Sequence, residues 1–329
     1  MISAGVLILL FVAFQLWGTG LRTGASQSAG LAEFQAKQAE ASRAPRGTTS
    51  TVPTTIGTTA SVAPTAPPTT GVAQPVTSDI APPKPGEPIG VITIPKIGAE
   101  FVSFEGVDLN YLSKGPGHFP GTPFPGQAGN AALAGHRTTW AAPFNRIDEL
   151  EPGDQIQIET VQGKFHYEVL PQLGPTPDTT IGYRIVQPSQ TEILDQPAGQ
   201  NLLTLMACHP KYSAAQRIVV VAKLVEPPAP TTEKSEESKA ATQTPDQEAL
   251  IGATDAGELF SNNPEDRGPA ALWSFVAAVV WLAAWVIARR WPSWKNWQRW
   301  TVYGAGLPLF IVPLFFAFEH INHLLPAGY

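Results

Sequence analysis

The chain has 329 residues, of which 43% are hydrophobic and only 15% are charged, and its formal net charge is −6. This mild acidity, and the lack of a basic face in the middle of the sequence, argue against a nucleic-acid partner. The only cysteine, Cys208, excludes a disulfide within the chain, so in an exported protein its thiol is expected to be either buried or used in chemistry.

The chain begins with an apolar segment. The run Ile2–Trp17 is apolar except for Ser3 and Gln15, and the basic residue Arg22 follows it. This run is slightly shorter than the roughly 20 residues that cross a bilayer, and no small-x-small cleavage site closes it. We therefore predict a retained transmembrane anchor over residues 1–22, in preference to a cleaved signal peptide.

Residues 23–88 are rich in Thr, Ala, Pro, Gly and Ser and contain almost no aromatic side chains. A segment of this composition cannot bury enough apolar surface to offset the entropy lost on ordering. We predict a disordered or extended linker that acts as a spacer and carries no chemistry.

The pattern changes over residues 89–226, where short apolar runs alternate with Pro- and Gly-containing turns. Only two short stretches, residues 108–113 and 143–150, are typical of helices. This many evenly spaced strands predict one all-β barrel or sandwich with its own core. The eight strand-like runs are residues 89–94, 99–107, 130–135, 154–160, 164–170, 182–187, 201–207 and 217–225.

The C-terminal part of the chain has the composition of a linker followed by two membrane spans. Residues 227–268 are acidic and rich in Pro and Thr, which predicts a second linker. Residues 269–288 are uncharged over a length that can cross a bilayer, and residues 301–329 predict a second transmembrane helix with a short tail.

Between these spans lies a loop, residues 289–300, with four basic residues, no acidic one, and a Trp at every third position from Trp291 to Trp300. Short basic loops lie on the cytoplasmic side of a membrane, and Trp is typical of the interface. With this loop inside, the N-terminal anchor and the C-terminal spans place residues 89–226 on the same, outer side. The sequence thus predicts an extracellular domain held at the cell membrane by three spans.

Three reactive side chains stand at the ends of predicted strands. Cys208 follows the apolar run 201–207, Arg217 opens the next run, and His136 follows the run 130–135 together with Arg137. A neighbouring cation lowers the pKa of a thiol and stabilises the attacking thiolate. A thiol, an imidazole and a guanidinium are the parts of a nucleophilic acyl-transfer site, provided that folding brings them together.

Metal binding is the rival interpretation of these histidines. No set of His, Cys, Asp and Glu in residues 89–226 has the tight spacing of metal ligands. The one close cluster is Glu319, His320 and His323, at the outer end of a predicted span, where it more simply marks the membrane interface. We expect neither a metal nor a cofactor.

Three blocks of the sequence, residues 115–144, 147–160 and 204–220, resemble the signature blocks of the sortase family. The nine-residue step from Cys208 to Arg217, with Pro210 and a Ser-Ala turn between them, is similar to the class E sortases of Gram-positive bacteria. The resemblance covers about residues 88–225. It does not extend to the two C-terminal spans.

This resemblance implies a closed β-barrel of about eight strands with short helices, and the activity of a cysteine transpeptidase that needs no cofactor. Cys208 would attack the carbonyl between Thr and Gly in an LPxTG or LAxTG sorting signal near the C-terminus of a surface protein. His136 would protonate the departing amine, and Arg217 would donate hydrogen bonds to the oxyanion. The acceptor would be the amine of a peptidoglycan precursor, or a pilin lysine.

Two positions depart from the family pattern. Ala207 precedes the cysteine where the family commonly has Thr, and Trp140 stands where Tyr is expected. Both departures leave the preferred sorting motif open. The candidate substrate-binding residues are His118, Trp140, Ala207 and His209.

Two further functions fit the same residues. In a thiol peptidase, water instead of an amine would resolve the acyl-enzyme. In a non-catalytic, membrane-tethered scaffold, the sortase-like domain would bind surface proteins without turnover, and the thiol of Cys208 would be inert.

Overall fold

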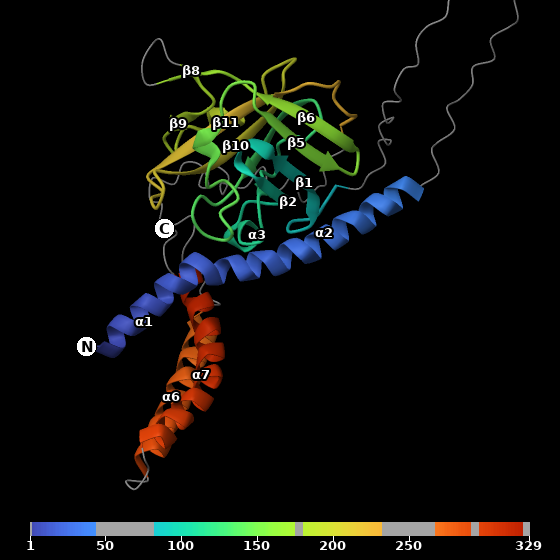
Figure 1. The fold of residues 1–329 in the computed structure, drawn as a ribbon. Coiled ribbons are helices and arrows are strands. Elements are labelled where there is room, and N and C mark those ends of the chain that lie inside the picture. The colour runs from blue at the N-terminus through green and yellow to red at the C-terminus, as the bar shows by residue number, and fades with distance from the viewer. Residues whose placement is uncertain (1, 44–81, 175–179, 232–266, 291–295, 325–329) are drawn as a thin grey trace, which may run out of the picture.

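The computed structural model describes residues 2–43, 82–174, 180–231, 267–290 and 296–324. Figure 1 shows one β-domain, a long N-terminal helical segment that runs beneath it, and a pair of C-terminal helices that point away from it. The reactive residues of the predicted site all belong to the β-domain.

Eight strands of the β-domain form a closed barrel, in the order β10-β4-β3-β2-β1-β5-β6-β11, and pairing of β11 with β10 closes the ring. The predicted closed all-β barrel is therefore confirmed. The strands are β1 (Pro88–Ile94), β2 (Ala99–Glu105), β3 (Gly117–His118), β4 (Gly129–Ala134), β5 (Gln155–Thr160), β6 (Gly163–Val169), β10 (Asn201–His209) and β11 (Gln216–Leu224).

Every predicted strand-like run forms a strand, but one of them lies outside the ring. The run 182–187 becomes β9 (Arg184–Val186), which pairs with β11 beside β6, and the two-residue strand β3 takes the eighth place in the barrel. A second small sheet joins β7 (Gln172–Leu173) to β8 (Thr180–Ile181). The short helices are η2 (Pro95–Ile97), α3 (Leu109–Leu112), η3 (Ile147–Glu149) and η4 (Thr191–Leu194).

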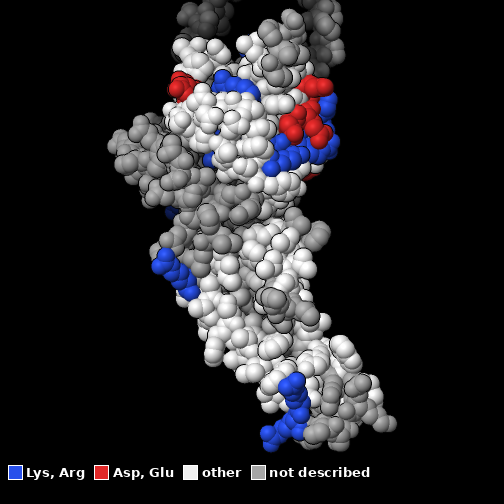
Figure 2. All heavy atoms as spheres, turned by 90° about the vertical axis from the view of Figure 1, so that its left-hand side faces the viewer, with Lys and Arg blue, Asp and Glu red and all other residues white. Residues whose placement is uncertain are grey.

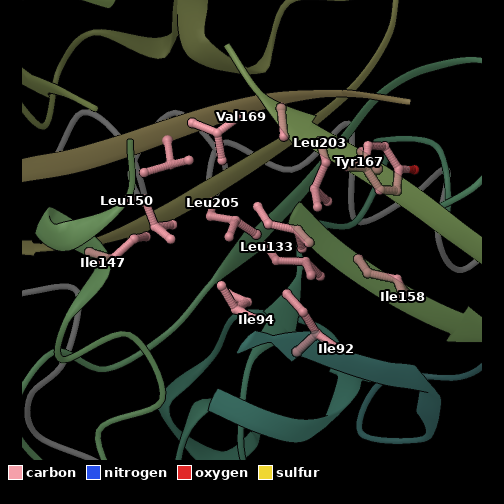
Figure 3. Packing of buried hydrophobic residues seen from close by; sticks show 14 of the residues in the cluster. Ile92, Ile94, Leu133, Ile147, Leu150, Ile158, Tyr167, Val169, Leu203 and Leu205 are labelled. Carbon is pink, nitrogen blue, oxygen red and sulfur yellow. The ribbon is translucent and has the colours of Figure 1, made fainter. Parts of the chain in front are cut away.

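The core fills the inside of the barrel because alternate side chains of each strand point inward. Ile92 and Ile94 of β1 meet Leu133 of β4 and Leu203 and Leu205 of β10 there, and all five are fully buried (Figure 3). The outer face of β4 and β10 is covered as well, by a second apolar cluster that includes Val107, Phe119 and Met206. Strand β10 is thus buried on both faces along most of its length.

The long N-terminal helical segment corrects the predicted 1–22 anchor and 23–88 linker. Helix α1 (Ile2–Ala13) continues through a π-helix, η1 (Phe14–Gly18), into α2 (Thr19–Arg43). Residues 23–43 are therefore helical, because their many Ala, Gln, Glu and Lys residues favour a helix and one side of α2 is buried against the barrel. Residues 44–81 lie outside the described part of the chain.

Two helices in the described residues are long and apolar enough to cross a membrane, and not the predicted three. They are α6 (Arg267–Arg290) and α7 (Asn296–Leu324). At about 1.5 Å per residue, the 12 residues of α1 and the 5 of η1 together extend about 25 Å, less than the roughly 30 Å of a bilayer core, and α2 after them is polar.

The predicted loop 289–300 is shorter than expected, since Arg289 and Arg290 end α6 and Asn296–Trp300 already belong to α7. Residues 291–295 lie outside the described part. Figure 2 shows Lys and Arg side chains at the tip of the α6–α7 pair and again near its upper end, with a stretch between them that has no red or blue residues. The predicted second linker, 227–268, also begins later, because Ala229 still pairs with Gln127 and is buried in the barrel. Residues 232–266 are outside the described part.

Candidate active site

The register of three strands brings the predicted reactive residues together. Strands β4 and β10 are parallel, with Ala134 opposite Met206, so His136 and Cys208 follow at the same end of the two strands. A hydrogen bond of 2.9 Å from the Gly135 N–H to the Met206 carbonyl extends this pairing to the strand ends. Strand β11 is antiparallel to β10 and sets Arg217 directly opposite Cys208.

His136, Cys208 and Arg217 line one cleft at this end of the barrel. The rest of its wall is mostly apolar and comes from β4, β10, α3 and the loops beside them. These residues are Val107, Leu112, Phe119, Ala134, Gly135, Met206 and Ala207. The predicted convergence of thiol, imidazole and guanidinium is therefore present in the structure.

Cys208 is partly buried and has no disulfide partner. Burial raises the pKa of its thiol, while the positive charges of Arg217 and Arg137 lower it by a smaller amount. Because the effect of burial is the larger one, the neutral thiol is favoured over the thiolate, and a proton acceptor is needed before the sulfur can attack.

His136 is the candidate acceptor, and it is also neutral. Burial lowers the pKa of its imidazole to about 4. Its Nε2 is one of the few buried side-chain atoms in the described residues that have no hydrogen-bond partner. The ring centroid of Trp140 lies 6.5 Å from that of the imidazole. An unpartnered, buried imidazole nitrogen beside a thiol is a group that can accept and return a proton.

This burial predicts an acid-dependent stability. Because the unfolded imidazole binds protons near its ordinary pKa of 6.5 and the folded one only near 4, folding is disfavoured as the pH falls through this window. As the pH falls from 7 to 4, we expect the titration of His136 to lower the free energy of unfolding by about 3 kcal/mol. The check is urea unfolding of the full chain in detergent, followed by tryptophan fluorescence, at both pH values.

The matched variant for this prediction is His136→Gln, which cannot titrate. Its loss of stability on acidification should be smaller than that of the unmodified chain by the same amount. Equal losses in the two proteins would show that the imidazole is not buried in its neutral form.

Arg217 is held by its own loop. Its Nη1 donates to the Ala214 carbonyl at 2.7 Å and to the Gln216 carbonyl at 3.0 Å, and the side chain is buried. A guanidinium has five N–H donors, so those on Nε and Nη2 remain to serve a substrate oxygen. Its orientation is thus fixed before any ligand binds.

Arg137 is the residue of this site that the sequence did not single out. Only 3% of it is exposed, its Nη1 donates to the Cys208 carbonyl at 3.2 Å, and its Nη2 lies 2.8 Å from Asp148. Its Nε donates to the Asn145 carbonyl at 2.9 Å. The side chain therefore ties the backbone of the cysteine to the loop after β4. The adjacent His-Arg pair at a strand end was the available signal.

His118 does not face the cleft. Its Nδ1 bonds to Glu105 at 2.6 Å and its Nε2 to the Pro123 carbonyl at 2.9 Å, all within the protein. Successive side chains of an extended segment point to opposite faces, so the neighbouring Phe119 lines the cleft instead. The predicted substrate contact at His118 is a buried structural contact.

The other three predicted substrate-binding residues differ in burial and in whether they line the cleft. Ala207 lines the cleft but is buried. Trp140 is buried beside His136 and is not part of the cleft lining. His209 follows the cysteine and is partly exposed, and the pKa of its imidazole is lowered by burial and by the charge of Arg137.

Among the described residues, no group of three His, Cys, Asp or Glu side chains could hold a metal ion. Glu319, part of the one close cluster in the sequence, instead forms an ion pair with Arg22. The side chain of His323 lies outside the described part.

Comparison with known proteins agrees with this geometry. The sortase-domain family model matches residues 92–225. Sortase SrtE1 of Streptomyces coelicolor is 29% identical over 239 residues, which cover 68% of this chain and 55% of that protein. Sortase D of Bacillus subtilis is 34% identical over 146 residues, 44% of this chain and 67% of that protein.

Among solved structures, the SrtF sortase from Corynebacterium diphtheriae is 29% identical, with a TM-score of 0.41, and the match covers 50% of this chain and 98% of that one. The chain spans only about half the length of its Streptomyces coelicolor relative, SrtE1. The sortase-domain model matches residues 92–225, and the chain is 34% identical to Sortase D of Bacillus subtilis over 67% of that protein. This chain therefore belongs to the sortase family.

Proposed function

We propose that this protein is a membrane-anchored cysteine transpeptidase. It cleaves a sorting signal of the LPxTG or LAxTG type between Thr and Gly and transfers the acyl group to an amine of a cell-wall precursor. The observation that carries the proposal is the meeting of Cys208, His136 and Arg217 in one cleft of a sortase barrel.

In the first half of the reaction, the thiol proton of Cys208 passes to His136 and the sulfur attacks the Thr carbonyl carbon. The oxyanion that forms accepts hydrogen bonds from the Nε and Nη2 groups of Arg217, which its loop holds in place. The imidazolium then gives its proton to the Gly nitrogen as the peptide bond breaks. A thioester on Cys208 remains, and the amine leaves.

The second half runs in the reverse sense with a new amine. His136 takes a proton from the incoming amine as its nitrogen attacks the thioester carbon, and the thiolate leaves and is reprotonated. An apolar cleft disfavours water at the thioester and so favours the amine as acceptor. The depressed pKa of His136 keeps the imidazole unprotonated and ready for this step at neutral pH.

The apolar lining of the cleft suits a substrate with an apolar side chain. Val107, Leu112 and Phe119 border the three reactive residues and offer a surface for the leading Leu of such a signal. The methyl group of Ala207 leaves this part of the wall without a hydroxyl. We therefore infer surface proteins that carry this kind of signal as substrates.

The charges of the α6–α7 pair support an arrangement in which this pair spans the membrane. Arg289 and Arg290 close α6 at the end of the pair that lies away from the barrel (Figure 1, Figure 2). Basic residues at this tip favour the cytoplasmic side, which leaves the barrel outside the cell.

Product analysis tests the proposal against the thiol peptidase. The full chain is incubated with a fluorescent LPxTG peptide, with and without a saturating amine such as triglycine. We expect the amide product to replace the hydrolysed acid as the amine concentration rises. Hydrolysis that is unaffected by the amine would favour the peptidase, and an intact peptide with an inert Cys208 thiol would favour the scaffold.

A further inference from the structure

Helix α2 covers an edge of β2 that no strand occupies. Strand β2 pairs with β3 only at Phe104 and Glu105, and in the part of the chain that the structure describes no strand lies beside the rest of this edge. There Gln27 of α2 accepts from the Val102 N–H at 2.6 Å and donates to the Val102 carbonyl at 2.9 Å. A side-chain amide thus replaces the neighbouring strand, which is one way in which proteins protect a sheet edge.

The contact between α2 and the barrel is close. A Cβ atom added to Gly30 would lie 2.7 Å from the ring of Phe104, and Phe34, one turn further on, is 2% exposed. Lys37 of the same helix pairs with Glu87 at 2.7 Å. The helix therefore has a defined position on the barrel along most of its length.

The same helix contacts two segments that each carry a cleft residue, Leu112 in one and His136 in the other. Thr23 donates to the Ser113 carbonyl at 2.8 Å, directly after α3, whose Leu112 lines the cleft. In the second segment, the Trp140 N–H donates to the hydroxyl oxygen of Thr19 at 3.2 Å. Trp140 lies four residues after His136 in the same loop.

The backbone at Trp140 adopts a conformation that is unfavourable for residues other than glycine. Trp140, Ala141 and Ala142 have φ angles of 54°, 61° and 45°, so three consecutive residues other than glycine lie in the left-handed region. Each such residue costs of the order of 1 kcal/mol, and the arrangement persists only where surrounding contacts hold it. The Thr19 hydroxyl is such a contact, since 1% of Thr19 and 3% of Trp140 are exposed.

The C-terminal pair of helices holds α2 at this same turn. Arg22, one turn after Thr19, forms an ion pair with the buried Glu319 of α7. Just before Thr19, the rings of Phe14 and Phe315 pack edge to face at 5.1 Å between centroids. Figure 1 shows the end of α7 at the junction of α1 and α2.

We propose that Thr19 is a positioning residue for catalysis: its hydroxyl holds the left-handed Trp140 turn and thereby the His136 imidazole, and the α6–α7 pair keeps Thr19 in place through Glu319 and Arg22. This inference rests on the proposed transpeptidase function. It assigns the two C-terminal spans a role in the geometry of the active site in addition to anchoring.

The test compares Thr19→Val with Thr19→Ser in the full chain, in detergent micelles. Valine keeps the shape of threonine but cannot accept the Trp140 N–H, whereas serine can. We expect Thr19→Val to lower kcat for cleavage of an LPxTG peptide by about tenfold with little change in KM, and Thr19→Ser to restore it. Rates are normalised to the Cys208 thiol that can be titrated in the folded protein.

A second measurement does not depend on turnover. Carbethoxylation of His136 by diethyl pyrocarbonate, followed by peptide mass spectrometry, reports how far the imidazole is shielded. We expect several-fold faster modification in Thr19→Val than in the unmodified chain. Arg22→Gln should change both readouts in the same direction, and Arg43→Gln, at the exposed far end of α2, should change neither.

The results separate this inference from the function on which it rests. Thr19→Val with an unchanged kcat and unchanged His136 modification would overturn the positioning role, even where the unmodified chain cleaves the peptide. If no variant cleaves the peptide but Thr19→Val still exposes His136, the placement of the loop by Thr19 is supported and the transpeptidase is overturned. If Thr19→Val does not fold, unchanged readouts for Arg22→Gln overturn the role of the C-terminal pair.

Discussion

Replacing Cys208 with alanine is expected to abolish cleavage of a sorting-signal peptide, with a loss of about 10⁴-fold or more in kcat. No other thiol exists in the chain, and the nucleophile of an acyl-transfer site has no substitute in the cleft. The measurement is the release of the Gly-containing fragment by the full chain and by Cys208→Ala at equal concentration.

The fold of this variant should be intact, since Cys208 lies at the end of β10 and contributes little to the core. Circular dichroism and the midpoint of thermal unfolding serve as the control. Cleavage by Cys208→Ala at the rate of the unmodified chain would place the chemistry elsewhere.

Replacing Arg217 with lysine is expected to lower kcat/KM by about 10²- to 10³-fold. Lysine keeps the positive charge but not the planar fork, in which one nitrogen bonds to Ala214 and Gln216 while the others face the cleft. Peptide cleavage by Arg217→Lys measures this loss. Arg184→Lys on the neighbouring strand β9 is the matched control, because Arg184 is exposed and does not line the cleft.

The charge of Arg217 can be separated from its geometry by thiol alkylation. Because Arg217 lowers the pKa of Cys208, Arg217→Gln should shift the pH profile of iodoacetamide labelling upward, and Arg217→Lys should shift it much less. Full peptide cleavage by Arg217→Lys would contradict the role of the guanidinium fork. An unshifted labelling profile in Arg217→Gln would contradict its effect on the thiol.

Much of the barrel and of the site could be predicted because strand patterns and strand ends are local signals. Cys208, His136 and Arg217 each stand where an apolar run stops or starts, and the parallel pairing of β4 with β10 converts this into proximity. Once the directions of the strands are known, the residues at the ends of these strands can be placed next to one another.

The errors occur where tertiary contacts override composition. β3 has two residues and no periodicity that could reveal it. Residues 23–43 contain six Ala and no Pro, unlike the Thr- and Pro-rich residues after them, and the average over residues 23–88 hides this difference. The position of α2 depends on a tertiary contact, in which Gln27 bonds to an unpaired edge of β2. His118 was predicted from its place in a family block, and its role in the fold depends on a carboxylate 13 residues earlier, Glu105.

The most direct test of the account is the intact mass of the full chain during turnover of an LPxTG peptide without an added amine. We predict a covalent adduct with the mass of the fragment that ends in Thr, located at Cys208 by peptide mapping and released by hydroxylamine, as a thioester is. Cleavage that proceeds with no adduct at residue 208, or an adduct at another residue, would contradict the proposed mechanism.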